Sequence, residues 1–280
     1  MQWRGRRESG NIEDRRGLSG GHVAVGGIGG LIIAVIIYFL GGDPNQVLQQ
    51  PDQSSVQSGY VDSPNDTMRQ EIAVVLADTE DVWDSLFNSM NKTYIKPTLV
   101  LFSGETQAGC GYASSATGPF YCPSDQKVYI DLSFFNELTS RFGAEGGDFA
   151  MAYVLAHEVG HHIQNLLGIS GKVDRLRSSL NETDFNKISV KLELQADFFA
   201  GIWAHYNQKM KNVLDRGDID EALSAASAVG DDRLQKQAQG YVVPDAFTHG
   251  TSEQRTYWFK KGYTTGDISQ GDTFNDAGLN

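Results

Sequence analysis

The apolar stretch 148–167, with His157 and His161 inside it, constrains the fold of this 280-residue chain more than any other segment. Glycines precede it and Gly168 follows it, so we expect one helix that starts at its first residue. Residues four apart lie on one face of a helix, and both imidazoles can therefore reach a single metal ion. Polar rings are costly to bury in so apolar a helix without a metal or partners, which favours a metal site over surface histidines.

Glu158 completes the pattern His-Glu-x-x-His, in which two imidazoles hold Zn²⁺ and the carboxylate takes a proton from the attacking water. Composition alone would produce this pattern in roughly one chain of this length in a hundred, so a third ligand is needed. A metzincin would have glycine and histidine three and six residues after His161, where this chain has Gln164 and Leu167. His162 projects about 100° around the helix from its neighbour and is expected to pack or support rather than to ligate.

A second segment, residues 191–201, offers two carboxylates one helical turn apart, Glu193 and Asp197. Catalytic zinc takes three protein ligands and keeps one position open. We expect Glu193 to be the third ligand and Asp197 to accept the outer N–H of a ligating histidine. A solvated acidic pair is the alternative, but the flanking residues are largely apolar, which favours burial and one Zn²⁺ per chain.

The chain has two cysteines, Cys110 and Cys122, at the ends of a turn-rich loop. A disulfide that closes so small a loop would stabilise the fold by about 3 kcal/mol. Unpaired thiols or metal ligation are the alternatives, but this spacing lacks the close pairing of zinc-ribbon cysteines. We expect a disulfide, as an oxidising compartment would permit.

An uncharged apolar segment, residues 23–40, approaches the length that crosses a bilayer as a helix. A secretory signal peptide is the alternative, but its apolar part is usually shorter and ends at a small-residue cleavage site. Five arginines precede residue 20, and no lysine or arginine occurs from residue 40 to 68. The positive-inside rule then places the N-terminus in the cytoplasm and the rest outside it, so we expect a single-pass membrane protein.

The net charge is −12, and the five early arginines leave the remainder more acidic still. Such a body repels phosphate backbones, which argues against nucleic acid as a partner. No pattern indicates an oligomeric state.

Periodicity predicts an α+β fold, mostly helical, with a small sheet early in the chain. We expect a first helix from about residue 67, strands at 98–102 and 127–132, and helices at 148–167, 184–210 and 219–229. The polar stretch 41–66 is expected to be a linker. The predicted organisation is an N-terminal cytoplasmic arm (1–22), a transmembrane helix (23–40), that linker and a metallopeptidase-like domain (67–280).

Together, the His-Glu-x-x-His helix and the Glu-x-x-Ala-Asp string at 193–197 resemble the gluzincin arrangement, in particular that of CAAX-prenyl-protease-like metallopeptidases. In that group a histidine followed six positions later by an arginine lies near the substrate. The resemblance therefore implies that His249 and Arg255 stabilise the oxyanion, although Gly250 stands where that group usually has proline.

Strings along nearly the whole chain resemble the putative neutral zinc metallopeptidase family of bacteria. They are RGRRES at 4–9, NIEDRRG at 11–17, GPFYCP at 118–123, VYIDL at 128–132, HEVGHHIQ at 157–164 and ELQAD at 193–197. The resemblance implies a zincin-like domain on one membrane helix, in the inner membrane with a periplasmic or extracellular domain. It names no substrate.

The resulting hypothesis is a zinc-dependent endopeptidase with Glu158 as general base and a peptide or protein substrate. One alternative is a membrane-anchored, zinc-containing binding module without protease activity, in which that carboxylate would have no use. Another is a hydrolase of a different amide bond, for example in the cell wall, since the same activated water serves both reactions.

Overall fold

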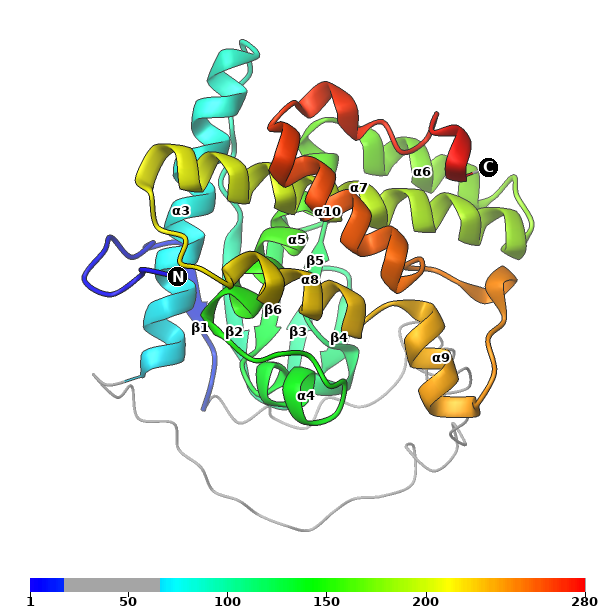
Figure 1. Ribbon diagram of the computed structural model, residues 1–280, viewed down its shortest axis with the longest axis horizontal. Helices are drawn as coiled ribbons and strands as arrows, with labels where there is room; N and C mark the ends of the chain where they lie inside the picture. Colours follow the sequence, from blue (N-terminus) through cyan, green and yellow to red (C-terminus); the bar gives the residue numbers. More distant parts are fainter. Residues whose placement is uncertain (18–65, 280) are drawn as a thin grey trace.

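The computed structural model describes residues 1–17 and 66–279. It confirms the α+β class, with helices predominating (Figure 1). The longer helices are α3 (Thr67–Ser89), α5 (Asp148–Leu166), α7 (Glu182–Lys211) and α10 (Ser252–Thr265). Shorter ones are α4 (Phe134–Ser140), α6 (Ile169–Arg177), α8 (Asp218–Ala228), α9 (Asp231–Gln239) and the 3₁₀ turns η1 (Ser115–Thr117), η2 (Pro244–Ala246), η3 (Ile268–Gly271) and η4 (Ala277–Leu279).

A four-stranded sheet has the order β1 (Ile12–Asp14), β2 (Thr98–Phe102), β6 (Lys127–Asp131), β5 (Phe120–Cys122). The pairs β1–β2 and β2–β6 are parallel, and β5–β6 is antiparallel. The strands β2 and β6 occur where the alternation of apolar residues predicts them. A separate hairpin joins β3 (Glu105–Ala108) to β4 (Gly111–Ser114).

Helix α5, which carries the His-Glu-x-x-His segment, lies at the centre of the core, in contact with α3, α6, α7, α8, β5 and β6. Fifteen of its nineteen residues are buried. The helices α7 and α10 run side by side (Figure 1), and glycines allow their close contact. A Cβ on Gly201 would lie 2.1 Å from the carbonyl oxygen of Phe259, and one on Gly262 would lie 2.2 Å from that of Phe198.

The predicted disulfide between Cys110 and Cys122 is present and connects the end of the β3–β4 turn to β5. The Cα atoms of the two cysteines are 5.8 Å apart. This bridge ties the hairpin to the edge of the main sheet.

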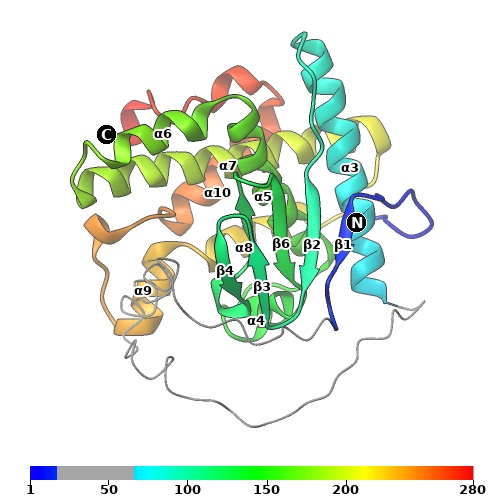
Figure 2. The ribbon, with the colours of Figure 1, turned by 180° about the vertical axis from the view of Figure 1, so that it is seen from behind.

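The N-terminal residues 1–17 pack against the domain instead of forming a separate arm. Strand β1 pairs in parallel with β2, at the edge of the sheet that is visible in Figure 2. The Trp3 side chain is buried, and its Nε1 donates to Oδ2 of Asp148 at 2.8 Å. The guanidinium of Arg6 lies 2.6 Å from the buried carboxylate of Asp78 on α3. These contacts make the arm part of the folded unit.

The structure contradicts the predicted placement in the membrane. That prediction was a single-pass inner-membrane protein with a cytoplasmic N-terminus and a domain outside. Residues 1–17 and the domain share one sheet, and two strands of one sheet cannot lie on opposite sides of a bilayer. The proposed membrane helix 23–40 and the linker up to residue 65 lie outside the described residues. Within the part of the chain that is described, no helix combines the length and the apolar character needed to span a bilayer.

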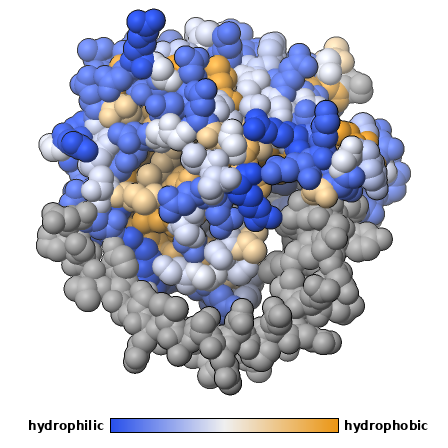
Figure 3. Space-filling model, turned by 60° about the horizontal axis from the view of Figure 1, so that its bottom comes forward, coloured by the Kyte–Doolittle hydropathy of each residue, from blue (hydrophilic) through white to orange (hydrophobic). Residues whose placement is uncertain are grey.

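The surface is mainly polar, in keeping with the 35 acidic and 23 basic residues of the chain. Figure 3 shows one face that is largely hydrophilic, with hydrophobic residues gathered near its middle. The most exposed large apolar side chains of the described residues are Tyr241, Tyr257 and Ile95.

Candidate metal centre

Helices α5 and α7 bring the three predicted metal ligands together. The Nε2 atom of His157 lies 3.2 Å from Oε2 of Glu193, and Nε2 of His161 lies 3.4 Å from Oε1 of the same carboxylate. One ligand atom from each of the three side chains lies within 4.8 Å of the others. Tetrahedral zinc with bonds of about 2.0–2.2 Å separates neighbouring ligand atoms by about 3.3–3.6 Å. The donor types therefore fit Zn²⁺, and the two histidine–carboxylate distances are close to this spacing.

Gly160, inside the His-Glu-x-x-His segment, sets how closely the two helices approach. A Cβ at this position would lie 2.8 Å from the carbonyl oxygen of Ala196 and 3.0 Å from its Cα. Only glycine fits there without a shift of backbone. Since Ala196 lies between Glu193 and Asp197 on α7, this contact determines the distance from the histidines to both carboxylates.

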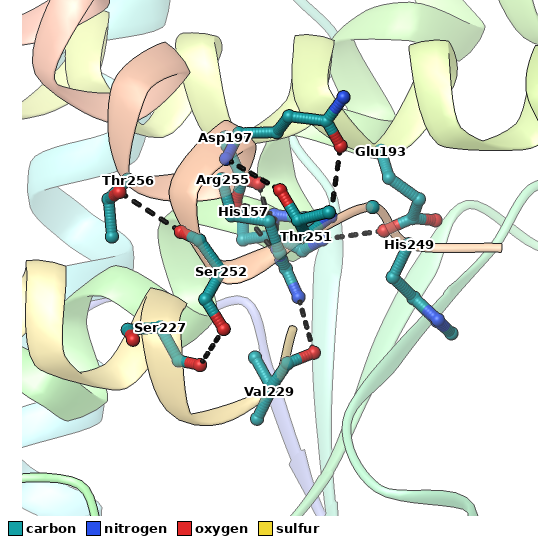
Figure 4. Close-up of polar contacts among 12 residues, drawn as sticks. His157, Glu193, Asp197, Ser227, Val229, His249, Thr251, Ser252, Arg255 and Thr256 are labelled. Atoms are coloured by element: carbon teal, nitrogen blue, oxygen red, sulfur yellow. Dashed lines mark hydrogen bonds and ion pairs between the residues drawn. The ribbon is translucent and has the colours of Figure 1, made fainter. Parts of the chain in front are cut away.

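Asp197 supports His157 from the side opposite to Glu193, as the sequence predicts. Its Oδ1 lies 2.9 Å from Nδ1 of His157 and also accepts the hydroxyl of Tyr153 at 2.6 Å. Arg255 donates to both oxygens of the carboxylate, from Nε at 2.8 Å and from Nη2 at 3.0 Å. Figure 4 shows His157, Asp197 and Arg255 close together where α7 and α10 meet. Because Nδ1 of His157 is bound to a carboxylate, Nε2 is the atom that faces the metal position.

His161 has a partner that the sequence reasoning missed. Its Nδ1 lies 2.9 Å from Oε1 of Gln164, one turn further along α5. This contact directs Nε2 of His161 toward Glu193. His162 is turned away from the centre, with its two ring nitrogens near the hydroxyl of Tyr121 and the carbonyl oxygen of Ile95, and it packs as predicted.

Opposite charges face one another in this buried group. Burial opposes the charge of His157, but Asp197 and Glu193 outweigh it and raise the pKa of His157 to about 10. Burial likewise disfavours the charge of Asp197, but Arg255 and His157 lower the pKa of Asp197 to about 2. The pKa of Glu193 is held well below its ordinary value by both histidines against its burial. A buried carboxylate that stays ionised needs positive charge beside it, which a metal ion or protons can supply.

Glu158 lies between the two histidines in sequence and is 7% exposed. Among the described residues, no hydrogen bond or ion pair engages its carboxylate. A carboxylate without a structural partner beside three metal donors is available for proton transfer.

His249 lies on the loop between η2 and α10, and its side chain is 49% exposed. Its Nδ1 is 3.2 Å from Oδ1 of Asp231, whose other oxygen accepts the backbone N–H groups of Thr248, His249 and Gly250. Partial burial opposes the charged ring, but Asp231 and the negative charge of Glu193 raise the pKa of His249. The ring is thus held near the centre by an oriented carboxylate.

Arg255, in contrast, is 4% exposed. Its guanidinium contacts Asp197, Tyr153 and Nδ1 of His157, the last at 3.4 Å. Nη1 also donates to the carbonyl oxygen of Val229 at 3.4 Å. The contacts with Asp197, Tyr153 and Nδ1 of His157 lie on the side of that imidazole away from its Nε2.

Helical spacing could have indicated two residues of the centre that the sequence analysis did not name. Tyr153 precedes His157 by four residues and Gln164 follows His161 by three, so both share the face of α5 that carries the ligands. Asp231 is distant in sequence from His249, and no local pattern links them.

The comparisons with known proteins cover almost the whole chain. The model of the family described as "Putative neutral zinc metallopeptidase" matches residues 1–274. The uncharacterized protein YpfJ of Escherichia coli (strain K12) is 50% identical over 288 residues, which cover 99% of this chain and all of the relative. The uncharacterized protein Rv2575 of Mycobacterium tuberculosis (strain H37Rv) is 42% identical over 261 residues, covering 86% of this chain and 85% of the relative. No solved structure matches the chain.

Proposed function

The chain belongs to the putative neutral zinc metallopeptidase family, and from this premise we propose that it is a zinc-dependent endopeptidase acting on peptides or proteins. The observation that carries the proposal is the convergence of His157, His161 and Glu193, with Glu158 near His161 and without a hydrogen-bond or ion-pair partner among the described residues. A purely structural zinc site would have no use for this additional carboxylate.

His157, His161 and Glu193 would hold Zn²⁺, which would supply Lewis-acid polarisation of the scissile carbonyl and lower the pKa of a water molecule to about 7. Glu158 accepts the proton of the attacking water and later delivers it to the leaving amine. The side chains of His161 and Glu193 are 17% and 19% exposed, so solvent and substrate have access to this side of the centre.

His249 and Arg255 take different roles in this proposal. His249 is half exposed and near Glu193, and it donates to the oxyanion that develops on the carbonyl oxygen. Arg255 acts through Asp197 instead, neutralising the buried carboxylate that orients His157. The role that the family resemblance implies for the arginine is therefore revised from substrate contact to positioning.

The test compares the full chain with its Glu158→Gln and Glu193→Ala variants for zinc content and for hydrolysis of casein or a quenched peptide. We expect one zinc per chain in the parent and in Glu158→Gln, with hydrolysis lost in both variants and zinc lost only in Glu193→Ala. Glu253→Gln, at an exposed position of α10, serves as the control and should behave as the parent.

Three results would point elsewhere. If the parent protein hydrolyses a cell-wall amide but no peptide, it is an amidase of the cell wall and not a peptidase. Zinc without hydrolysis of any substrate would favour a binding module. A parent without zinc would overturn the proposal.

A further inference from the structure

The two histidines of the centre are supported by chemically different groups. Asp197, a carboxylate with its own guanidinium partner, faces His157, whereas the neutral amide of Gln164 faces His161. An amide can accept through its oxygen and donate through its nitrogen, so its orientation decides which proton arrangement it favours on the ring.

The orientation of this amide is determined by what lies on its far side. Nε2 of Gln164 donates to the backbone carbonyl oxygen of Leu192 at 2.6 Å and to Oε1 of Gln195 at 3.2 Å. A carbonyl oxygen accepts hydrogen bonds and cannot donate them, so the amide nitrogen of Gln164 must point to Leu192. Its oxygen is then left facing Nδ1 of His161.

Gln195 continues the same direction of donation. Its Nε2 donates to the backbone carbonyl oxygen of Gly271 at 2.8 Å, in η3 near the C-terminal end of the chain. The chain of amides thus ends on a second group that can only accept. Both glutamines are buried, at 0% and 5% exposure, which limits competition from water for these bonds.

The anchor at Gly271 is itself tightly placed. A Cβ on this residue would lie 2.5 Å from the ring of Phe198, so the C-terminal segment rests directly on α7. Next to it, the buried Thr273 donates from its hydroxyl to the carbonyl oxygen of Lys191 at 2.6 Å. The position of the acceptor is therefore fixed by packing and by a neighbouring hydrogen bond.

We infer that Gln164 and Gln195 form a positioning chain that keeps the proton of His161 on Nδ1 and its Nε2 lone pair toward the metal. The backbone carbonyls of Leu192 and Gly271 determine the direction in which the two amides donate. The oxygen of Gln164 is therefore the atom that faces His161. The inference rests on the zinc function proposed above. It assigns the C-terminal segment a role in metal binding although that segment supplies no ligand.

Glutamine is the side chain that this position requires. A glutamate at 164 could accept from His161 but would place a carboxylate oxygen against the carbonyl of Leu192. Methionine has nearly the same length and shape and makes neither bond, so Gln164→Met removes the interaction with little change of volume.

The first experiment measures the zinc dissociation constant of the full chain by competition with a chelator. We expect Gln164→Met to bind zinc about 10–100-fold more weakly, since loss of an outer hydrogen-bond partner typically has that effect. Gln237→Met, at an exposed position of α9, is the control and should leave the constant unchanged. In the Co²⁺ form, the visible absorption of Gln164→Met should shift, because the orientation of one ligand changes.

The second experiment separates positioning from packing. Gln195 borders a cavity of about 440 Å³ between α6, α7 and the C-terminal segment, so methionine can be accommodated there. Gln195→Met alone should weaken zinc binding by a smaller factor than Gln164→Met. In the Gln164→Met background it should have no further effect on zinc binding, while its effect on the melting temperature persists.

The outcomes are distinct from those of the proposed function. If the parent binds zinc and Gln164→Met binds it equally well with an unchanged Co²⁺ spectrum, the positioning chain is wrong and the peptidase proposal stands. If the two substitutions weaken zinc binding additively, Gln195 does not act through Gln164. If Gln164→Met does not fold, Gln195→Met still tests the inference. An unaltered zinc affinity of Gln195→Met would contradict it.

Discussion

Asp197 is the residue on which the centre and the stability of the fold depend together. It is completely buried and accepts hydrogen bonds from Tyr153 and Arg255, and its Oδ1 lies against Nδ1 of His157. Arg255 in turn has no other carboxylate partner among the described residues. Removing the charge of either one leaves the other buried and uncompensated.

Asp197→Asn should therefore affect two measurements at once. We expect zinc affinity to fall by about 10–100-fold because His157 loses its orienting carboxylate. The free energy of unfolding should fall by about 3–5 kcal/mol because the guanidinium of Arg255 is left without a counter-charge. Chelator competition and urea unfolding measure these effects, and Asp174→Asn on the exposed face of α6 is the control. An unchanged free energy of unfolding would show that the charge of Arg255 is neutralised in another way.

Glu71 on α3 should make stability depend on pH. It is 4% exposed, and burial together with the charge of Asp148 raises its pKa to about 8, from 4.5 in the unfolded chain. Below pH 4.5 both states are protonated. As the pH rises toward 8, only the unfolded state ionises, so the free energy of unfolding falls over this range.

Glu71→Gln removes this ionisation. We expect the variant to exceed the parent in stability by about 1–3 kcal/mol at pH 8 and by little at pH 4. Urea unfolding at the two pH values measures the difference, and Glu182→Gln at the exposed start of α7 is the control. An equal difference at both pH values would mean that ionisation of Glu71 is not its cause.

At the scale of single residues, helical spacing within the two motifs predicted the side chains that meet at the candidate metal centre, but it did not single out Tyr153 or Gln164. His157 with His161, and Glu193 with Asp197, are each one turn apart, and the apolar flanks of both segments indicate buried helices that can face each other. Asp231 could not be predicted, because its pairing with His249 depends on how α9 packs beside the loop that follows it.

At the scale of elements, long periodic segments were predictable and short or polar ones were not. Helices α5 and α7 and strands β2 and β6 occur close to their expected bounds, since their apolar residues recur with the period of the element. Helix α10 was missed because it is polar over much of its length and carries Gly262 in its interior. Strand β1 has three residues, too few to show a period.

The contact between α7 and α10 should be intolerant of any side chain at Gly201. Gly201→Ala places a methyl group 2.1 Å from the position of the Phe259 carbonyl oxygen, so the helices must separate. We expect the free energy of unfolding to fall by about 1–3 kcal/mol or more. Gly171→Ala in α6, where a Cβ meets only the end of Arg175 at 3.9 Å, should instead stabilise by about 0.5–1 kcal/mol. Thermal or urea unfolding of both variants tests these two expectations. An unchanged free energy of unfolding in Gly201→Ala would contradict the close contact.

At the scale of the whole molecule, the N-terminal arginines explain why the sequence suggested a different topology. An excess of arginine before an apolar segment is typical of a cytoplasmic flank. In the fold, Arg6 and Arg7 pair with Asp78, Glu80 and Asp81 of α3. The same charges therefore serve as docking contacts, and a rule based on composition does not distinguish the two uses.

Because residues 1–17 are part of the folded unit, a shortened chain that begins at Asp66 should be less stable than the full chain. It lacks strand β1, the buried Trp3 and the arginine pairs with α3. Loss of a buried tryptophan alone typically costs about 3–5 kcal/mol, so the free energy of unfolding should fall by at least that amount. The comparison requires urea unfolding of both chains under the same conditions.

A synthetic peptide of residues 1–17 provides the decisive control, because a ligand that binds only the folded state raises its apparent stability with concentration. The peptide should raise the melting temperature of the shortened chain progressively, while the same peptide with Trp3→Ala and Arg6→Ala should have little effect, since it lacks the contacts with Asp148 and Asp78. Restoration by both peptides alike would indicate non-specific binding. A shortened chain as stable as the full one would mean that the arm lies on the domain without contributing to its folding.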